Sequence, residues 1–368
     1  MSFVQINKTQ TKEAHRTALF ELGFRPFFIG AGVFAVVSIL AWLLVYGFQY
    51  PIQTTPYSLF EWHAHEMIYG FSLAVISGFL LTAIMNWTGV QTLNGTKLQL
   101  LFIAWLVPRI ALLFGTTFIS IAAIFDLLFV FGLLYAVTSP ILKAKQLKQF
   151  AIVTIIGLLA LGNLIFYLDA FNIYQNGAFV GIYGGLFLVI SLILTIGGRV
   201  MPAFIKNGVD QEVDIKNPLW VALLSLGLFI VFSINYIFLG NSTLTGSLSL
   251  LLFIFTSYRL FCWHTPGIWS KPLLWGLFCA YLFINLGFLL FAAHAFMSSS
   301  VFFAIHAFAY GGIGLATLAM MPRVSLGHTA RSVRSPPRGT SLILIVLTLG
   351  ALMRVVLPIF DAVNYISL

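Results

Sequence analysis

Long apolar runs separated by short polar segments dominate the hydrophobic pattern of this chain. Most runs approach or exceed the roughly 20 residues that an α-helix needs to cross the hydrocarbon core of a bilayer. Eleven such spans can be placed, at 26–48, 59–84, 98–114, 118–140, 150–168, 178–198, 218–239, 245–262, 272–293, 300–321 and 340–358. The pattern predicts an all-α integral membrane protein, a polytopic bundle of transmembrane helices.

The composition supports this interpretation. Of the 368 residues, 60% are hydrophobic and only 8% are charged, which is more apolar surface than a soluble domain could bury. No small-residue cleavage site follows the first apolar run, so we expect it to be retained as a span. The predicted organisation is a cytoplasmic amino-terminal segment at 1–25, one transmembrane domain at 26–358 and a short periplasmic tail at 359–368.

The distribution of Lys and Arg gives the orientation of the bundle. The net charge is +9, and the basic residues fall in alternate loops. The loops at 49–58, 115–117, 169–177, 240–244 and 294–299 contain neither Lys nor Arg. The positive-inside rule therefore places the amino terminus in the cytoplasm and the carboxyl terminus outside. The positive charge is a topology signal in a lipid bilayer, and we expect no nucleic-acid partner.

Three of the predicted helices resemble one another. IYGFSLAVISGFL (68–80) in the second helix is similar to IYGGLFLVISLIL (182–194) in the sixth, and AYGGIGLATLAMM (309–321) in the tenth follows the same pattern. These helices run in the same direction and lie four spans apart. The similarity is consistent with an internal four-helix repeat.

Two histidines precede this pattern at the same distance. His65 and His306 each lie four residues before a Tyr-Gly pair, near the outer ends of the second and tenth helices. Neutral imidazoles on facing helices are good metal ligands, and two of them on opposite sides of a porphyrin would hold a b-type haem. Ligand binding at such a haem would have to displace one imidazole, which favours redox or sensing chemistry.

His63 must point away from His65, because two residues on an α-helix differ by about 200° of rotation. Glu66 and Met67 lie on the face of His63, three and four residues further on. An imidazole, a carboxylate and a thioether could bind copper. The alternative is that these polar groups are interfacial anchors, with the carboxylates at the positive end of a helix.

Arginines at the same depth could complete a haem site. Arg109 and Arg354 lie near the outer ends of the third and eleventh helices, where a guanidinium could pair with a haem propionate. A structural ion pair between Arg109 and Asp126, or snorkelling of Arg109, is the alternative.

A second polar cluster is predicted at the cytoplasmic ends. A second site or a proton entry could be framed there by Arg25, Arg199, Arg323 and His328. Positive-inside anchoring explains the three arginines almost as well.

Several blocks together resemble the NnrS family of bacterial membrane proteins. They are FELGFRPFF (20–28), WHAHEMIYGF (62–71), GFLLTA with NWTG (78–89), GGRVMP (197–202), and IHAFAYGGIG with RVSLGHTAR (305–331). The resemblance implies an inner-membrane protein of roughly twelve spans, one more than counted above. It also implies b-type haem, copper, and a role in the nitric oxide response, in denitrification or in defence against nitrosative stress. The family motifs match this chain at His63, His65, Glu66, His306, His328, Arg25, Arg109, Arg199 and Arg354.

The leading hypothesis is therefore a haem–copper protein that binds or processes nitric oxide near the periplasmic face. The chain contains no C-x-x-C-H haem attachment motif and no dinucleotide-binding fingerprint, so electrons for turnover would come from quinol or another protein. Catalysis, sensing and protection all remain open at this point. The alternative from a different class is a multi-pass transporter for a small solute or a metal, without a bound haem.

Overall fold

The computed structural model describes residues 18–50, 57–114 and 116–360, and within these ranges it contains helices and no strand. The main helices are α1 (Phe24–Trp42), α2 (Leu59–His65), α3 (Leu73–Thr88), α4 (Gly95–Ala111), α5 (Ile119–Lys143), α6 (Phe150–Ala170), α7 (Gly177–Gly208), α8 (Leu219–Ile234), α9 (Ser242–Trp263), α10 (Pro272–Met297), α11 (Val301–His306), α12 (Leu315–His328) and α13 (Gly339–Phe360). Residues 1–17 of the predicted amino-terminal segment and 361–368 of the predicted tail lie outside the described residues.

Eleven helical spans in the described part are long and apolar enough to cross a membrane, as the sequence predicts. Their limits agree with the predicted ones to within a few residues at most ends. The largest differences are at α7 and α12, which continue past the predicted ends at 198 and 321 to Gly208 and His328. Both extensions contain a proline within the helix, at Pro202 and Pro322, and the helix continues through it.

The described part of the chain contains four short π-helical segments that no sequence pattern predicted; two of them end α1 and α8, and two lie inside longer helical spans. Two of them matter for function, η3 (Glu66–Ser72) and η9 (Ala307–Gly314). Segment η3 joins α2 to α3, and η9 joins α11 to α12, so each of these spans is a single rod with a π-turn inside it. Each π-segment begins directly after one of the two histidines that precede a Tyr-Gly pair. The similarity between the second and tenth spans therefore extends to the backbone, whereas α7 remains α-helical through its own Tyr-Gly pair.

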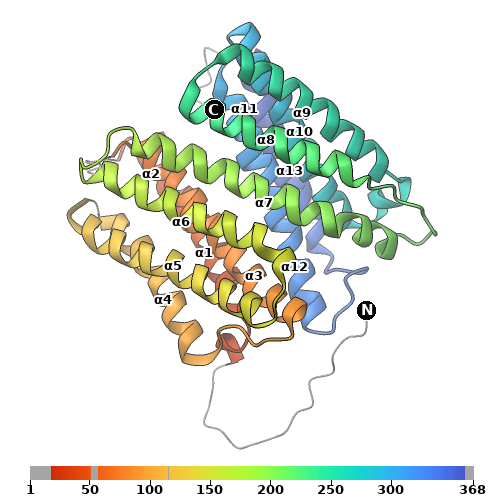
Figure 1. The fold of residues 1–368 in the computed structure, drawn as a ribbon, viewed down its shortest axis with the longest axis horizontal. Coiled ribbons are helices and arrows are strands. Elements are labelled where there is room, and N and C mark those ends of the chain that lie inside the picture. Colours follow the sequence, from red (N-terminus) through yellow and green to blue (C-terminus); the bar gives the residue numbers. More distant parts are fainter. Residues whose placement is uncertain (1–17, 51–56, 115, 361–368) are drawn as a thin grey trace, which may run out of the picture.

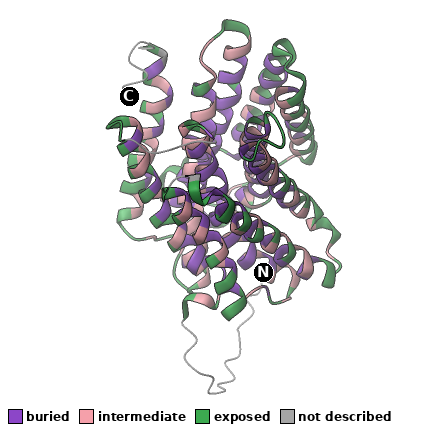
Figure 2. Cartoon of the chain, turned by 90° about the vertical axis from the view of Figure 1, so that its left-hand side faces the viewer, coloured by how far each residue is buried: buried purple, intermediate pink, exposed green. Residues whose placement is uncertain are grey.

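The bundle has two halves, with α7 between them (Figure 1). Helices α1–α6 form one half and α8–α13 the other, while α7 contacts elements of both. The spans Leu59–Thr88 and Pro272–Met297 are the central ones, because 78% of an 18-residue apolar stretch in each is buried inside the protein. Figure 2 shows buried residues on the inner helices and exposed residues at the periphery, which is the arrangement expected when the outer faces meet lipid.

Glycines allow the closest helix contact in the bundle, between α6 and α7. Gly177, Gly181 and Gly185 recur every four residues on α7, the small-residue spacing that brings membrane helices together. A Cβ atom at Gly181 would lie 2.6 Å from the carbonyl oxygen of Gly162 on α6. The carbonyl oxygen of Gly181 itself accepts a 2.6 Å hydrogen bond from the Tyr69 hydroxyl, which connects η3 to this helix contact.

We therefore expect Gly181→Ala to destabilise the protein by about 1–3 kcal/mol, because the added methyl group would force two backbones apart. The matched control is Gly227→Ala on α8, where an added Cβ meets nothing within 4 Å. There the higher helix propensity of alanine should leave stability unchanged or raise it by up to about 1 kcal/mol. Unfolding in detergent followed by circular dichroism measures both variants, and equal effects would contradict the close-contact explanation.

Candidate functional site: two histidines, two environments

A capping box fixes the start of α2 and so positions its histidines. The Ser58 hydroxyl accepts a hydrogen bond from the Glu61 backbone N–H at 3.2 Å, and the Glu61 carboxylate accepts one from the Ser58 N–H at 2.6 Å. This reciprocal pair satisfies two donors at a helix start. Glu61, the first acid of the EWHAHE stretch, is therefore a structural residue. His63 and His65 follow within the next turn, on different faces of α2.

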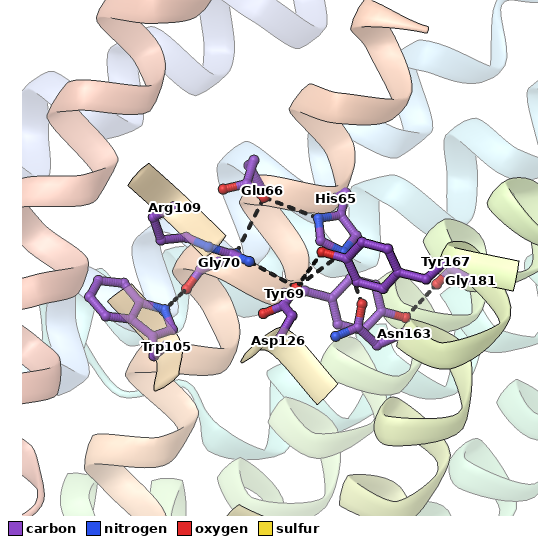
Figure 3. Close-up of polar contacts among 10 residues, drawn as sticks. All are labelled: His65, Glu66, Tyr69, Gly70, Trp105, Arg109, Asp126, Asn163, Tyr167 and Gly181. Carbon is purple, nitrogen blue, oxygen red and sulfur yellow. Dashed lines mark hydrogen bonds and ion pairs between the residues drawn. The ribbon is translucent and has the colours of Figure 1, made fainter. Parts of the chain in front are cut away.

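His65 lies in a buried ionic network, shown in Figure 3. Its Nδ1 is 3.1 Å from Oε1 of Glu66, and its Nε2 is 2.9 Å from Oδ1 of Asn163 and 3.5 Å from Oδ2 of Asp126. Arg109 joins the two acids, with Nη1 3.3 Å from Oε1 of Glu66 and Nη2 2.8 Å from Oδ2 of Asp126. All four ionisable side chains are at most 2% exposed. The network thus combines residues of α2, η3, α4, α5 and α6.

The contacts of His65 specify its chemistry. Both ring nitrogens lie within hydrogen-bond distance of side chains of this network, Nδ1 of Glu66 and Nε2 of Asn163. Neither nitrogen faces an open space among the described residues. His65 is thus enclosed by the ion pairs of Arg109 with Glu66 and Asp126, and its role as a haem ligand stays a prediction.

Aromatic residues enclose His65 on its remaining sides. Its ring stacks on Phe166 at a centroid distance of 4.2 Å, and Tyr167 approaches it edge-on at 5.4 Å. The Tyr167 hydroxyl donates a 3.0 Å hydrogen bond to Oδ2 of Asp126. Asn163, Phe166 and Tyr167 all lie on α6, and the sequence analysis missed them. A polar Asn within an apolar run is the signal that could have pointed to them.

His63 has entirely different surroundings. Its ring stacks on Trp42 at 4.3 Å, and its Nδ1 is buried without a hydrogen-bond partner among the described residues. His306 and Arg354 are both near enough to act on His63 electrostatically, and Arg354 also acts on His306. The residues His63, His306 and Arg354, which we call the outer histidine site, thus come from α2, α11 and α13. His63 is thus a histidine of α2 on which His306 acts electrostatically.

His306 is oriented as metal-binding histidines usually are. Its Nδ1 lies 2.7 Å from the carbonyl oxygen of Phe302, one turn earlier in α11. A carbonyl accepts only, so Nδ1 carries the hydrogen and Nε2 keeps its lone pair. Such a second hydrogen bond fixes the ring and raises its basicity as a ligand. The outer histidine site therefore offers the kinds of groups that a haem would need, an imidazole from each of two helices and a guanidinium for a propionate, while the haem itself stays a prediction.

The Glu66 carboxylate contacts Arg109 and His65, and no contact between Glu66 and His63 is found among the described residues. In the described part of the chain, no three His, Cys, Asp or Glu side chains form a metal-binding group. His63 and Met67 remain as candidate copper ligands, and copper itself stays a prediction.

The structure also resolves the two interpretations of Arg109. The guanidinium forms the Arg109–Asp126 ion pair that was the structural alternative, and its second acid is Glu66. Arg109 therefore belongs to the network around His65. Arg354 is the arginine that lies beside His306.

The residues predicted to form a cytoplasmic cluster contact separate partners. Arg25 pairs with Glu21 at 3.0 Å, Arg199 donates to Gln149 at 3.1 Å, and the guanidinium of Arg323 lies 3.6 Å from the centre of the Phe204 ring. The Nε2 of His328 is 3.4 Å from Nδ2 of Asn86, and its ring lies 5.9 Å from that of Phe24. The contacts show four anchoring points along the basic end of the bundle. The second site or proton entry stays a prediction.

Comparison with known protein families identifies the family to which this chain belongs. The NnrS family model matches residues 18–368, nearly the whole chain. The chain belongs to the NnrS family. No curated protein matches it. The match to NnrS includes every element described above, from the start of α1 through the outer histidine site to α13. For this NnrS protein the family and the multi-pass helical membrane fold are thus established.

Proposed function

We propose that this NnrS protein binds nitric oxide at a b-type haem held by His63 and His306 near the periplasmic end of the bundle, in the bacterial inner membrane. The observation that supports it most directly is the pair of imidazoles from distant helices with nitrogens available for a metal. Nε2 of His306 keeps its lone pair, and Nδ1 of His63 has no partner among the described residues. A haem iron, when bound there, would supply the centre that binds nitric oxide.

Each residue of the outer histidine site has a distinct task in this proposal. The Phe302 carbonyl holds the His306 ring in one orientation, and stacking on Trp42 restricts the ring of His63. Arg354 can donate two parallel hydrogen bonds to a propionate carboxylate. Nitric oxide is small and uncharged, so it can reach a buried site through the lipid. Electrons for any turnover would come from quinol or another protein, and catalysis, sensing and protection are all compatible with this site.

Optical spectroscopy with metal analysis tests this function. We expect detergent-purified protein to show a Soret band in the oxidised and dithionite-reduced states, a shift of that band with nitric oxide, and iron close to one per chain. Copper measured in the same sample tests the copper prediction, for which Met67 remains a candidate ligand. A colourless protein without iron or copper would contradict the proposal and favour a transporter of a small solute.

A further inference from the structure

A buried arginine at the opposite end of the bundle has no acidic partner in the described part of the chain. Arg259 lies on α9, four residues before this helix ends at Trp263, and its side chain is only 5% exposed. Its guanidinium lies over the Trp263 ring at 4.6 Å, and its Nε has no hydrogen-bond partner. No described carboxylate contributes to its electrostatic environment, in which Tyr281 is the only other ionisable group.

The neighbouring helix is built to admit this guanidinium. A Cβ atom at Gly198 on α7 would overlap Nη2 of Arg259, and one at Gly197 would overlap the hydroxyl of Tyr281. The Gly-Gly pair of the GGRVMP block therefore forms a recess against α9 and α10. The need for this recess explains the Gly-Gly pair at this position of α7. The side chain of Arg259 points toward α7, which distinguishes it from an arginine that snorkels to the lipid surface.

The other polar groups around this recess satisfy one another. The Tyr281 hydroxyl donates to the carbonyl oxygen of Ile193 at 2.7 Å. The side chain of Asn217 donates to the Gly198 carbonyl at 3.0 Å and accepts from the Trp263 indole at 3.2 Å. None of these groups offers Arg259 a negative charge. Arg259 is thus the charged residue of this group, and no described residue balances its charge.

A guanidinium stays protonated in proteins, so Arg259 cannot become neutral by losing a proton. Burial of an unpaired charge is strongly unfavourable for the free energy of folding. The contrast with Arg109 is informative, because that buried arginine contacts two carboxylates. Attraction to the Trp263 ring compensates only a small part of the desolvation. The missing negative charge must therefore come from outside the described chain.

We propose that Arg259 binds a small monovalent oxyanion in the recess between α7, α9 and α10. One positive charge calls for one negative charge, and the flat fork of the guanidinium matches two oxygens of a planar anion. This inference is independent of the function proposed for the outer histidine site.

Thermal unfolding with defined anions tests the proposal. Detergent-purified protein in sodium gluconate is titrated with sodium nitrate or sodium formate at constant ionic strength. We expect a saturable rise in the unfolding temperature of the wild type, and no rise in Arg259→Gln. Arg259→Lys keeps the charge without the fork, so its apparent Kd for nitrate should be at least tenfold higher. Arg259→Lys also provides the test if Arg259→Gln does not fold. Arg323→Gln, which removes an arginine that lies on a phenylalanine ring, should keep the wild-type response.

Three outcomes would overturn the site. One is a nitrate response of Arg259→Gln or of Arg259→Lys that equals the response of the wild type. Another is the lack of a saturable response to either anion in the wild type. The third is a response only to phosphatidylglycerol micelles, which would identify a lipid headgroup as the partner. Because the readout is unfolding temperature and needs no haem, failure here leaves the proposed nitric oxide site unaffected.

Discussion

His63→Ala and His306→Ala should each lower the haem content of the purified protein at least tenfold, while His65→Ala should retain haem in the molecules that fold. The reason is geometric. His63 and His306 share one neighbourhood and have nitrogens available, whereas both nitrogens of His65 lie within hydrogen-bond distance of side chains of the network around it. Loss of a ligating imidazole removes one of two bonds to iron, and even loss of the hydrogen bond behind a ligand typically costs 10–100-fold in metal affinity. The pyridine haemochrome assay gives haem per chain.

A matched control separates ligand loss from a general effect of removing a histidine. His294→Ala removes an imidazole at the same end of the bundle whose Nδ1 is 2.6 Å from the carbonyl oxygen of Ser299. This variant should keep its haem. Size-exclusion profiles of all four variants show which of them remain folded. If His65→Ala loses haem and His63→Ala retains it, the pairing of His65 with His306 that the sequence suggested is the right one.

The spans were predictable because the membrane imposes strong and local constraints. A helix that crosses lipid needs about 20 apolar residues, and basic loops remain on one side. Both signals can be read without knowing any tertiary contact. The limits of Leu219–Leu239 and Pro272–Met297 accordingly match the predicted spans closely. The extension of α7 to Gly208 was missed because Arg199 and Pro202 resemble the end of a span.

The candidate site was predictable only in part. The sequence identified His63, His65 and His306 as unusual, because ionisable groups at membrane depth are functional candidates. It could not say which ring meets which partner, since that depends on the π-turns and on α6. Glu66 contacts Arg109 on α4, which is a tertiary contact that no periodicity in the sequence reveals.

Arg259 illustrates a different limit of sequence reasoning. It lies near the basic end of its helix, where an arginine is expected to anchor the protein at the membrane surface. Only the structure shows that the side chain turns inward onto Gly198 and Trp263. For arginines in membrane helices, the direction of the side chain therefore matters as much as its depth.

Arg109→Gln should be the most destabilising single substitution in the network around His65. It would leave the carboxylates of Glu66 and Asp126 buried beside one another without the guanidinium that joins them. Removing one partner of a buried ion pair typically costs about 3–5 kcal/mol. That is a large fraction of the free energy of unfolding of a typical domain, about 5–15 kcal/mol. We expect a much lower yield of folded protein and a lower unfolding temperature in detergent.

Asp126→Asn should cost less than Arg109→Gln, and the ion pairs of Arg109 explain the order. After Asp126→Asn, Arg109 still has Glu66 as its acid. After Arg109→Gln, neither Glu66 nor Asp126 keeps the guanidinium with which it pairs. The double variant should recover part of the loss, because contacting residues are energetically coupled. Arg199→Gln, at an exposed position with Gln149 as its partner, should stay within about 0.5 kcal/mol of the wild type. If Asp126→Asn proves more damaging than Arg109→Gln, the network is held together by its hydrogen bonds and not by its charge balance.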